Sequence, residues 1–256
     1  MKRAGKITAI CAGVLLLPLL QACGSPEDEE IPPDPQASMV LLPAKSKFVV
    51  GSRDYQPQRT VAIKSFYISR WETTQMQYEE VMGENPSTDE GPQLPVHDVS
   101  WIDAARFCNK LSQQRGLDPC YNESDYSCDM SKNGFRLPTS AEWEYACRGD
   151  STAVYFWGND KDESYCVASG SIKPVGSVEP NPRELYDMAG NVSEWCQDET
   201  DDEIWRIYRG GSCKDAGWKT FECKWYGRGR QDEGWSAVGF RFVRSAHDDM
   251  DEDDDQ

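Results

Sequence analysis

Apolar residues occur in short bursts along most of the chain rather than in long periodic runs. Continuous or alternating apolar residues predict strands in "KFVVGS", "TVAIKSFYIS" and "VGFRFVR". Glycine-rich and proline-rich turns separate these stretches, and nine tryptophans and eleven tyrosines supply large side chains for a core. We therefore expect an α+β fold with a high coil content. Because no second linker or repeat interrupts residues 39–245, we expect one domain there.

Three positions carry the signature of a helix N-terminus, in which a hydroxyl residue is followed three residues later by an acid or an amide. The pairs are Thr74 with Gln77, Ser100 with Asp103, and Thr139 with Glu142. After Ser100 the apolar residues recur at helical spacing until Gly116, and the segment after Thr139 ends at Gly149. The sequence therefore predicts helices that begin at these hydroxyl residues.

The first 23 residues have the layout of an export signal, with three basic residues, an apolar run and the ending "LQAC". The run is too short to span a membrane comfortably and stay as an anchor. "LQAC" resembles the lipobox of bacterial lipoproteins, which predicts cleavage before Cys23 and acylation of its thiol. An ordinary signal peptide cut nearby and a buried apolar strand are the alternatives. We expect an exported protein anchored to the bacterial envelope by this lipid, and Gly24 favours the outer membrane.

Two terminal segments carry most of the formal net charge of −17. Residues 24–38 contain five acids among prolines, and residues 246–256 contain seven acids. These compositions predict a disordered tether and a disordered acidic tail, with weak calcium binding as the alternative for the tail. The acidic balance argues against nucleic acid as a partner and against electrostatic binding to anionic lipid headgroups.

Eight of the ten cysteines remain once Cys11 and Cys23 are assigned to the signal and the lipid site. An even number in an exported chain suggests disulfides. Cys120 and Cys128 bracket a short insertion, and we expect them to form a local clip. No CxxC pair or histidine cluster is present, so a zinc site is not expected.

Two further cysteines, Cys108 and Cys147, fall on the inner faces of the predicted helices. They are expected either to pair with each other or to remain as buried free thiols. Of the two histidines, His97 precedes Asp98, and His247 lies in the acidic tail. A three-histidine iron centre within the chain is therefore excluded. His97 is an acid or base candidate, but a loop histidine satisfied by its neighbours is the commoner arrangement.

Several long blocks appear in a fixed order, among them "GFRLPTSAEWEYACRGD", "LYDMAGNVSEWCQD", "YRGGS" and "VGFRFVR". In this order they resemble the formylglycine-generating enzyme family, also called the sulfatase-modifying factor domain, over nearly all of residues 38–245. The resemblance implies a variant of the C-type-lectin-like fold, with modest sheets, two main helices and much ordered coil. It also makes Trp143 a structural residue.

In some relatives the loop that matches "LYDMAGNVSEW" helps to hold calcium through oxygen ligands, which hard cations prefer. The resemblance makes Asn191 and Glu194 the candidate calcium ligands. A turn asparagine and a surface acid are the alternative reading of the two residues. Ser193 replaces the aromatic residue that usually stands between them in the family.

Relatives that oxidise a cysteine to formylglycine carry a cysteine pair after the "RGGS" turn, and soft thiolates there select copper(I). At the two matching positions this sequence has Asp215 and Thr220, whereas Cys213 directly follows Ser212. Two thiols in an oxidising compartment more simply form a disulfide, so we expect Cys213 and Cys223 to be a staple. The alternatives are a copper or redox pair made by the same two cysteines, or separate partners for each of them elsewhere in the chain.

The sequence thus predicts a lipid-anchored, extracytoplasmic domain of this family that acts as a binding or envelope-assembly module for a protein or glycan partner. No cofactor is firmly expected, with calcium an option. The candidate contact surface consists of the aromatic residues Trp218, Phe221, Trp225 and Tyr226. The alternative is a copper-dependent formylglycine-generating oxidase that acts on exported sulfatases through Cys213 and Cys223.

Overall fold

The computed structural model describes residues 34–52, 54, 56–200 and 204–246. Cys23, the predicted signal and the acidic residues 247–256 with His247 lie outside this range. The predicted tether ends earlier than expected, because Asp34 caps a short 3-10 helix and forms an ion pair with Arg115 at 2.7 Å. Within the described residues, no helix has the length and apolar character needed to cross a membrane.

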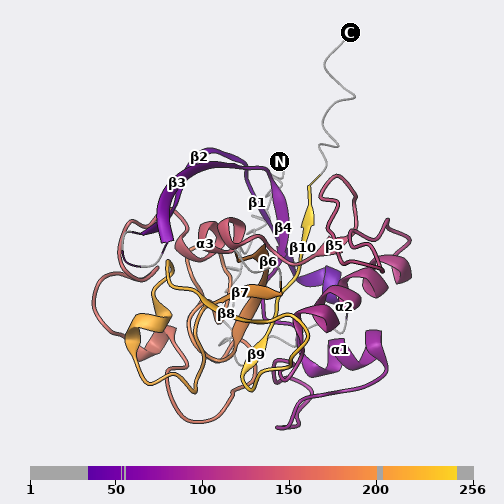
Figure 1. Ribbon diagram of the computed structural model, residues 1–256. Coiled ribbons are helices and arrows are strands. Elements are labelled where there is room, and N and C mark those ends of the chain that lie inside the picture. Colours follow the sequence, from indigo (N-terminus) through magenta and orange to yellow (C-terminus); the bar gives the residue numbers. More distant parts are fainter. Residues whose placement is uncertain (1–33, 53, 55, 201–203, 247–256) are drawn as a thin grey trace, which may run out of the picture.

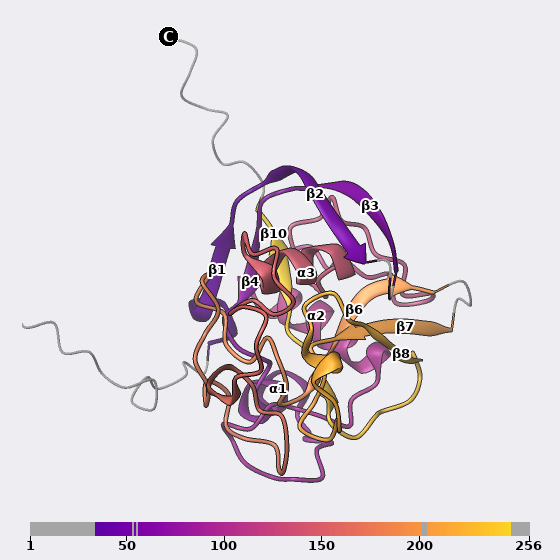
Figure 2. The same ribbon diagram turned by 90° about the vertical axis from the view of Figure 1, so that its left-hand side faces the viewer.

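A long, bent antiparallel hairpin opens the domain and arches over helix α3 (Figures 1 and 2). Its register pairs Met39 with Ser69 at one end and Lys45 with Ile63 further along, so the two arms continue through the bend. The predicted strand "TVAIKSFYIS" spans the bend and forms parts of β3 and β4. The four strands are β1 (Met39–Leu42), β2 (Lys45–Ser52), β3 (Gln56–Ile63) and β4 (Phe66–Ser69).

The lower part of this hairpin belongs to a four-stranded sheet with the order β1-β4-β10-β5. Its other strands are β5 (Phe135–Arg136) and β10 (Val243–Ser245). Val243 pairs with Ile68 on one side and with Arg136 on the other. The last described strand therefore lies inside the sheet, next to the first hairpin.

A second sheet has the order β8-β7-β6-β9, with β9 parallel to β6 and the other pairs antiparallel. Its strands are β6 (Ser193–Glu199), β7 (Trp205–Arg209), β8 (Gly227–Arg230) and β9 (Val238–Gly239). The predicted strand "VGFRFVR" is wrong as one element, because residues 240–242 cross between the sheets. In this crossing, the Arg241 guanidinium donates to the carbonyls of Ser69 and Arg70, both at 3.2 Å.

All three predicted capping boxes are confirmed, each with both of its hydrogen bonds. The helices are α1 (Gln75–Met82), α2 (Trp101–Gln114) and α3 (Ser140–Arg148). Short 3-10 helices are η2 (Pro35–Ser38), η3 (Glu163–Tyr165) and η4 (Trp218–Phe221). The α+β class, the single domain and the high coil content are as expected.

Three fully buried tryptophans anchor the core, and each indole N–H has a partner. Trp101 donates to the Cys196 carbonyl at 2.9 Å, and Trp195 donates to the Val99 carbonyl at 3.0 Å. Trp143 donates to the Glu194 carboxylate at 2.6 Å. Burying these rings without an unsatisfied donor supplies apolar area where the strands are short.

Candidate functional site

The "RGGS" turn follows β7 and holds two glycines with positive φ, +89° at Gly210 and +69° at Gly211. A Cβ on Gly211 would lie 2.9 Å from both the Phe221 ring and the Thr220 carbonyl, so the turn requires glycine there. The Asp215 carboxylate then accepts from the Ser212 amide at 2.7 Å and from its hydroxyl at 2.9 Å. The "RGGS" segment is thus a tight turn that the Asp215 carboxylate closes by hydrogen bonds to Ser212.

The two positions that match the copper ligands carry oxygen-containing side chains that already form hydrogen bonds. Asp215 closes the turn on Ser212, and the Thr220 hydroxyl donates to the Gly217 carbonyl at 2.8 Å. Oxygen ligands are poor partners for the soft cuprous ion. The residues at these two positions therefore do not fit a copper(I) centre.

Cys213 and Cys223 belong to different parts of the core, so the predicted staple between them is wrong. The Cys213 amide donates to the Asn191 carbonyl at 2.9 Å, which places Cys213 in a small apolar cluster with Val192. Cys223 follows helix η4 and lies in the main core, where its Sγ is 2.6 Å from the Sγ of Cys147. Cys147 therefore lies beside Cys223, and the expected alternative pairing of Cys147 with Cys108 is not seen.

The predicted disulfide clip between Cys120 and Cys128 is not formed, because both residues carry free thiols, and backbone hydrogen bonds close the loop instead. Tyr121 and Cys128 form an antiparallel bridge, and the Asp129 amide donates to the Cys120 carbonyl at 2.8 Å. Burial raises the pKa of the Cys128 thiol to about 12. The protonated thiols make this clip a hydrogen-bonded loop rather than a reactive pair.

The predicted calcium ligands are engaged by other groups. Both Glu194 oxygens accept from the Arg241 guanidinium at 2.7 Å, and one also accepts from the Trp143 indole. The Asn191 side-chain oxygen accepts from the Lys173 amide at 2.9 Å, and its nitrogen donates to Glu72 at 2.6 Å. These two side chains do not fit a calcium site. Among the described residues, no group of three or more His, Cys, Asp or Glu side chains is arranged to hold a metal ion.

Sequence reasoning missed two further acids beside this pair, Glu72 and Asp187, both buried. Burial raises the pKa of Glu72 well above its usual range and raises that of Asp187 to about 7. Asp187 accepts from the Gly176 amide at 2.6 Å through one oxygen, and its other oxygen has no partner within the described residues. Three carboxyl groups thus share one cation, Arg241.

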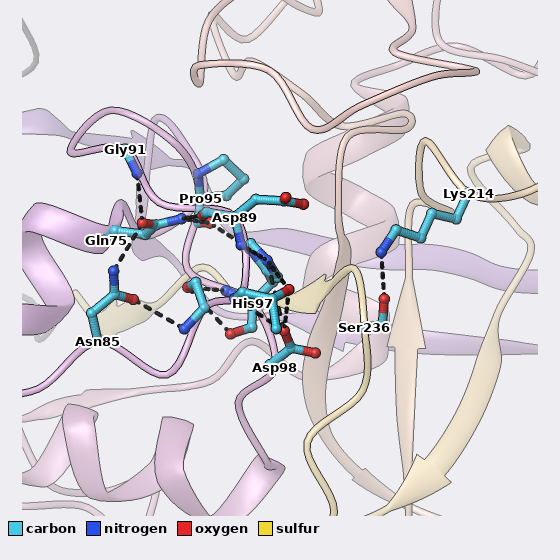
Figure 3. Close-up of polar contacts among 11 residues, drawn as sticks. Gln75, Asn85, Asp89, Gly91, Pro95, His97, Asp98, Lys214 and Ser236 are labelled. Carbon is cyan, nitrogen blue, oxygen red and sulfur yellow. Dashed lines mark hydrogen bonds and ion pairs between the residues drawn. The ribbon is translucent and has the colours of Figure 1, made fainter.

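His97 is buried in the loop between α1 and α2, and its ring nitrogens face the backbone and Thr88 (Figure 3). Its Nδ1 lies 3.2 Å from the Pro95 carbonyl, and its Nε2 lies 3.4 Å from the Asp89 amide. The Asp98 carboxylate also lies 3.7 Å from Nε2, so both ring nitrogens have polar neighbours from the same loop. His97 therefore holds its loop and does not face a substrate.

The same close-up shows how Gln75 fixes this loop from α1 (Figure 3). The Gln75 side-chain oxygen accepts from the Asn85 side chain at 2.9 Å and from the Gly91 amide at 3.0 Å. Its nitrogen donates to the Asp89 carbonyl at 2.8 Å. On the neighbouring coil, Lys214 donates to the Ser236 hydroxyl. These contacts order coil segments and leave no acid, base and nucleophile converging on a common point among the residues drawn.

Of the four aromatic residues in the predicted contact surface, one is buried and three are partly exposed. Phe221 is fully buried in the main core, whereas Trp218, Trp225 and Tyr226 are partly exposed. Phe221 is buried because it packs against the Gly211 turn and the Trp218 ring, 5.9 Å away between centroids. A core aromatic cannot be told from a surface aromatic in this segment by sequence alone.

A different group of partly exposed rings gathers on one face of the second sheet: Tyr208, Trp225 and Trp235, here called the aromatic face. Tyr208 lies against Gly227, where an added Cβ would come within 2.3 Å of its ring. A Cβ added to Gly229 would lie 2.6 Å from the ring of the buried Trp195 and 3.3 Å from the ring of Trp235. Because Gly227 and Gly229 alternate along β8, the Tyr208 and Trp235 rings cover the same side of the strand.

Trp225 completes the aromatic face, with its ring 6.1 Å from that of Tyr208. Between the two glycines, Arg228 is exposed and its guanidinium lies 5.6 Å from the Trp205 ring on the other side of the strand. The signal for this arrangement in the sequence is the alternation in "GRGR", which the strand prediction had not included.

The comparison with protein families decides the family. The family model described as "Sulfatase-modifying factor enzyme 1-like domain" matches residues 27–246. The chain belongs to this family. The sulfatase-modifying-factor-like domain thus covers all the described strands and helices.

Similar proteins differ in their names and lengths. The chaperone protein LppX of Paenibacillus barcinonensis is 33% identical over 243 residues, covering 76% of this chain and 85% of LppX. The formylglycine-generating enzyme of Bos taurus is 26% identical, covering 65% of this chain and 59% of that enzyme. Among solved structures, Treponema denticola variable protein 1 aligns with a TM-score of 0.74 at 28% identity, covering 81% of this chain and 95% of that one.

The buried acids predict how the stability of the domain depends on pH. Asp187 has a folded pKa of about 7 and a lower one when unfolded, so the folded state keeps a proton that the unfolded chain releases. The stabilisation is complete below about pH 4 and is lost as pH rises to 7, by up to about 1.4 kcal/mol per pH unit. The free energy of unfolding, measured with urea at several pH values in this range, should fall less steeply with pH in Asp187→Asn than in the original chain. The exposed control Asp160→Asn should keep the pH dependence of the original chain. The same pH dependence in all three chains would contradict a raised pKa at Asp187.

The thiol geometry predicts a specific cross-link. Treatment with oxidised glutathione should join Cys147 to Cys223, because their sulfurs are already in contact. Peptide mapping without reduction should find this linked pair, and should find it again in the control Cys213→Ser. A linked peptide containing Cys213 and Cys223 would contradict the pairing of Cys147 with Cys223.

Proposed function

We propose that this domain is a non-catalytic binding module, held at the bacterial envelope by a lipid on Cys23. The single observation that carries the binding role is the aromatic face, in which Tyr208, Trp225 and Trp235 lie on a glycine-containing strand. Partly exposed aromatic rings and arginines are enriched at the centres of protein interfaces. Rings offer large contact area at a small cost in side-chain entropy.

The glycines of β8 let two rings of this surface pack directly on the strand. Because Gly227 and Gly229 carry no side chains, Tyr208 and Trp235 contact the backbone of β8 and also pack against the buried core around Trp195. Each of the three aromatic residues is partly exposed, and Arg228 supplies a positive charge on the opposite side of the same strand. Such a surface suits a protein partner, or a glycan whose apolar ring faces stack on aromatic side chains.

The residues at the copper positions support a role without oxidase chemistry, since Asp215 and Thr220 are oxygen residues held in turn contacts. The similarity to LppX, which is named a chaperone, also favours a role in binding other chains. The alternative of a formylglycine-generating oxidase draws on the similarity to the bovine enzyme. It would require Cys213 and Cys223 to share an ion, although they lie in separate clusters.

A site-specific cross-linking experiment tests the binding role. A photoreactive residue placed at the exposed Ser236, directly after Trp235 of the aromatic face, should yield a discrete adduct in intact cells, and the same residue at the exposed control position Gln113 on α2 should not. The double variant Trp225→Ala, Trp235→Ala should reduce the adduct by about tenfold, because aromatic anchors supply most of an interface's energy. Equal labelling from both positions would refute the aromatic face as the contact surface. Copper(I) bound at one ion per chain, and lost in Cys213→Ser, would favour the oxidase instead.

The anchor makes a separate prediction. Mass spectrometry of the N-terminal peptide from membranes should find a diacyl or triacyl group on Cys23, and Cys23→Ser should release the protein from the membrane fraction. An unmodified mature chain that begins at another residue would rule out the lipid.

A further inference from the structure

The two strands of the arch that β2 and β3 make over α3 differ in how their backbone groups are used. Along β2, the Val49 carbonyl accepts from Arg148 at 2.9 Å, and the Gly51 amide donates to Glu144 at 3.1 Å, so side chains of α3 cover this strand. Residues 57–63 of β3 pair with β2 alone and form no hydrogen bond to a side chain among the described residues. An open strand edge of this kind presents unpaired donors and acceptors to an extended chain.

A groove of about 470 Å³ borders this open edge. Its lining includes every residue from Val61 to Ser65, whereas one face of a strand would contribute only alternate residues. The edge itself, with its backbone groups, therefore forms one wall. The opposite wall includes Ala141 and Glu142 of α3, the helix over which the arch passes (Figures 1 and 2).

Both acids of the groove are already engaged. Arg136 of β5 lines the groove and is only 2% exposed, and its terminal nitrogens bind the Glu142 carboxylate at 2.7 and 2.8 Å. Asp198 accepts from the Ser140 amide. The Arg136 Nε has no hydrogen-bond partner within the described part of the chain. The lining thus contains a spare donor and no spare carboxylate.

Along the chain, the groove is apolar in the middle and cationic at both ends. Ile63 belongs to the main core, Val61 packs against it, and Met130 adds apolar surface from the facing loop. Arg59 and Lys64 lie on either side of this apolar part, are exposed, and form no ion pair with another described residue. The groove therefore suits a segment that carries acids on both sides of an apolar residue.

The charge of the arch argues against a second copy of this chain as the occupant. Residues 45–52 and 56–64 contain no acid, in a chain whose net charge is −17. Their four cationic side chains are Lys45, Lys47, Arg59 and Lys64. Pairing two β3 edges would bring the cations of both copies into one sheet, which is unfavourable. A segment with carboxylates would instead meet opposite charge at each end of the groove.

We propose that this groove binds an extended, acidic segment of a partner protein, which adds to the open edge of β3 as a further strand. An apolar side chain of the segment packs on Val61, and acidic side chains two positions away on either side meet Arg59 and Lys64. Backbone hydrogen bonds supply affinity, and the alternation of side chains supplies specificity. No residue of the aromatic face lines this groove, so the two surfaces are separate.

A synthetic peptide tests the charge complementarity. The probe is a blocked peptide of threonines with a central valine and a glutamate two positions away on each side. It should bind the full chain in a fluorescence anisotropy titration, and Arg59→Gln should weaken binding about fivefold. The matched variant Lys47→Gln removes the same charge from β2, outside the groove lining, and should leave binding nearly unchanged. Equal losses in the two variants, or no binding at all, would overturn the proposal.

A second peptide of the same composition tests the alternation. Its glutamates stand directly beside the valine, so they point to the opposite face of an extended strand. This peptide should bind about fivefold more weakly than the first, because its acids turn away when the valine faces Val61. Equal binding of the two peptides would show attraction by charge alone and would refute strand addition.

Hydrogen exchange and N-methylation test the added strand itself. With the first peptide bound, the amides of residues 57–63 should exchange about tenfold more slowly, and those of α2 should be unchanged. N-methyl groups placed either on the valine and glutamates or on the threonines between them block alternate amides of the peptide. Only one of these two peptides should lose binding, because alternate amides face β3. Equal effects, or unchanged exchange in β3, would contradict the proposal.

Two other occupants would each overturn the proposal if found. Dimerisation of the full chain in sedimentation, abolished by the first peptide, would assign the edge to a second copy. Peptide binding that appears only in a chain ended after Ala246 would assign the groove to the chain's own end. None of these readouts depends on the aromatic face or on Cys23, so they stand whether or not the proposed function holds.

Discussion

The buried ion pair between Glu194 and Arg241 is the contact that joins the two sheets. Glu194 belongs to β6 in the second sheet, and Arg241 lies in the crossing that leads to β10 in the first. The guanidinium also binds carbonyls at the end of β4, and the carboxylate receives the indole of Trp143 from α3. Removing one partner would leave an uncompensated buried charge, which costs about 3–5 kcal/mol. Both sheets, α3 and the central coil therefore depend on one salt bridge.

The pair also explains why the loop that resembles a calcium site has a different use here. Glu194 faces a guanidinium cation, and Asn191 connects Glu72 to the coil at Lys173. The positive charge in this part of the core is thus supplied by Arg241 itself. A network of this kind is costly to desolvate but fixes one arrangement of the surrounding chain.

Local chemistry was predictable from the sequence, and distant contacts were not. The capping boxes at Thr74, Ser100 and Thr139 depend on residues three apart, so the sequence contains the whole interaction. The neighbour of Cys223 is 76 residues away, and the spacing to Cys213 favoured the wrong partner. The "RGGS" turn was informative because the two positions that match the copper ligands are found by counting a few residues from it along the sequence. The aromatic face was missed, because its rings come from β7 and two separate coils and meet only over the glycines of β8.

The position of β10 sets the order of events when the domain is made. Strand β4 is synthesised early, yet its neighbour in the sheet arrives about 175 residues later along the chain. Such separated pairing gives a large loop-closure cost before any contact rewards it, and it slows folding. The β10 side of β4 therefore stays unpaired until nearly all of the domain has been synthesised. Any helper that shields β4 during that interval would act before the domain has a native state to recognise.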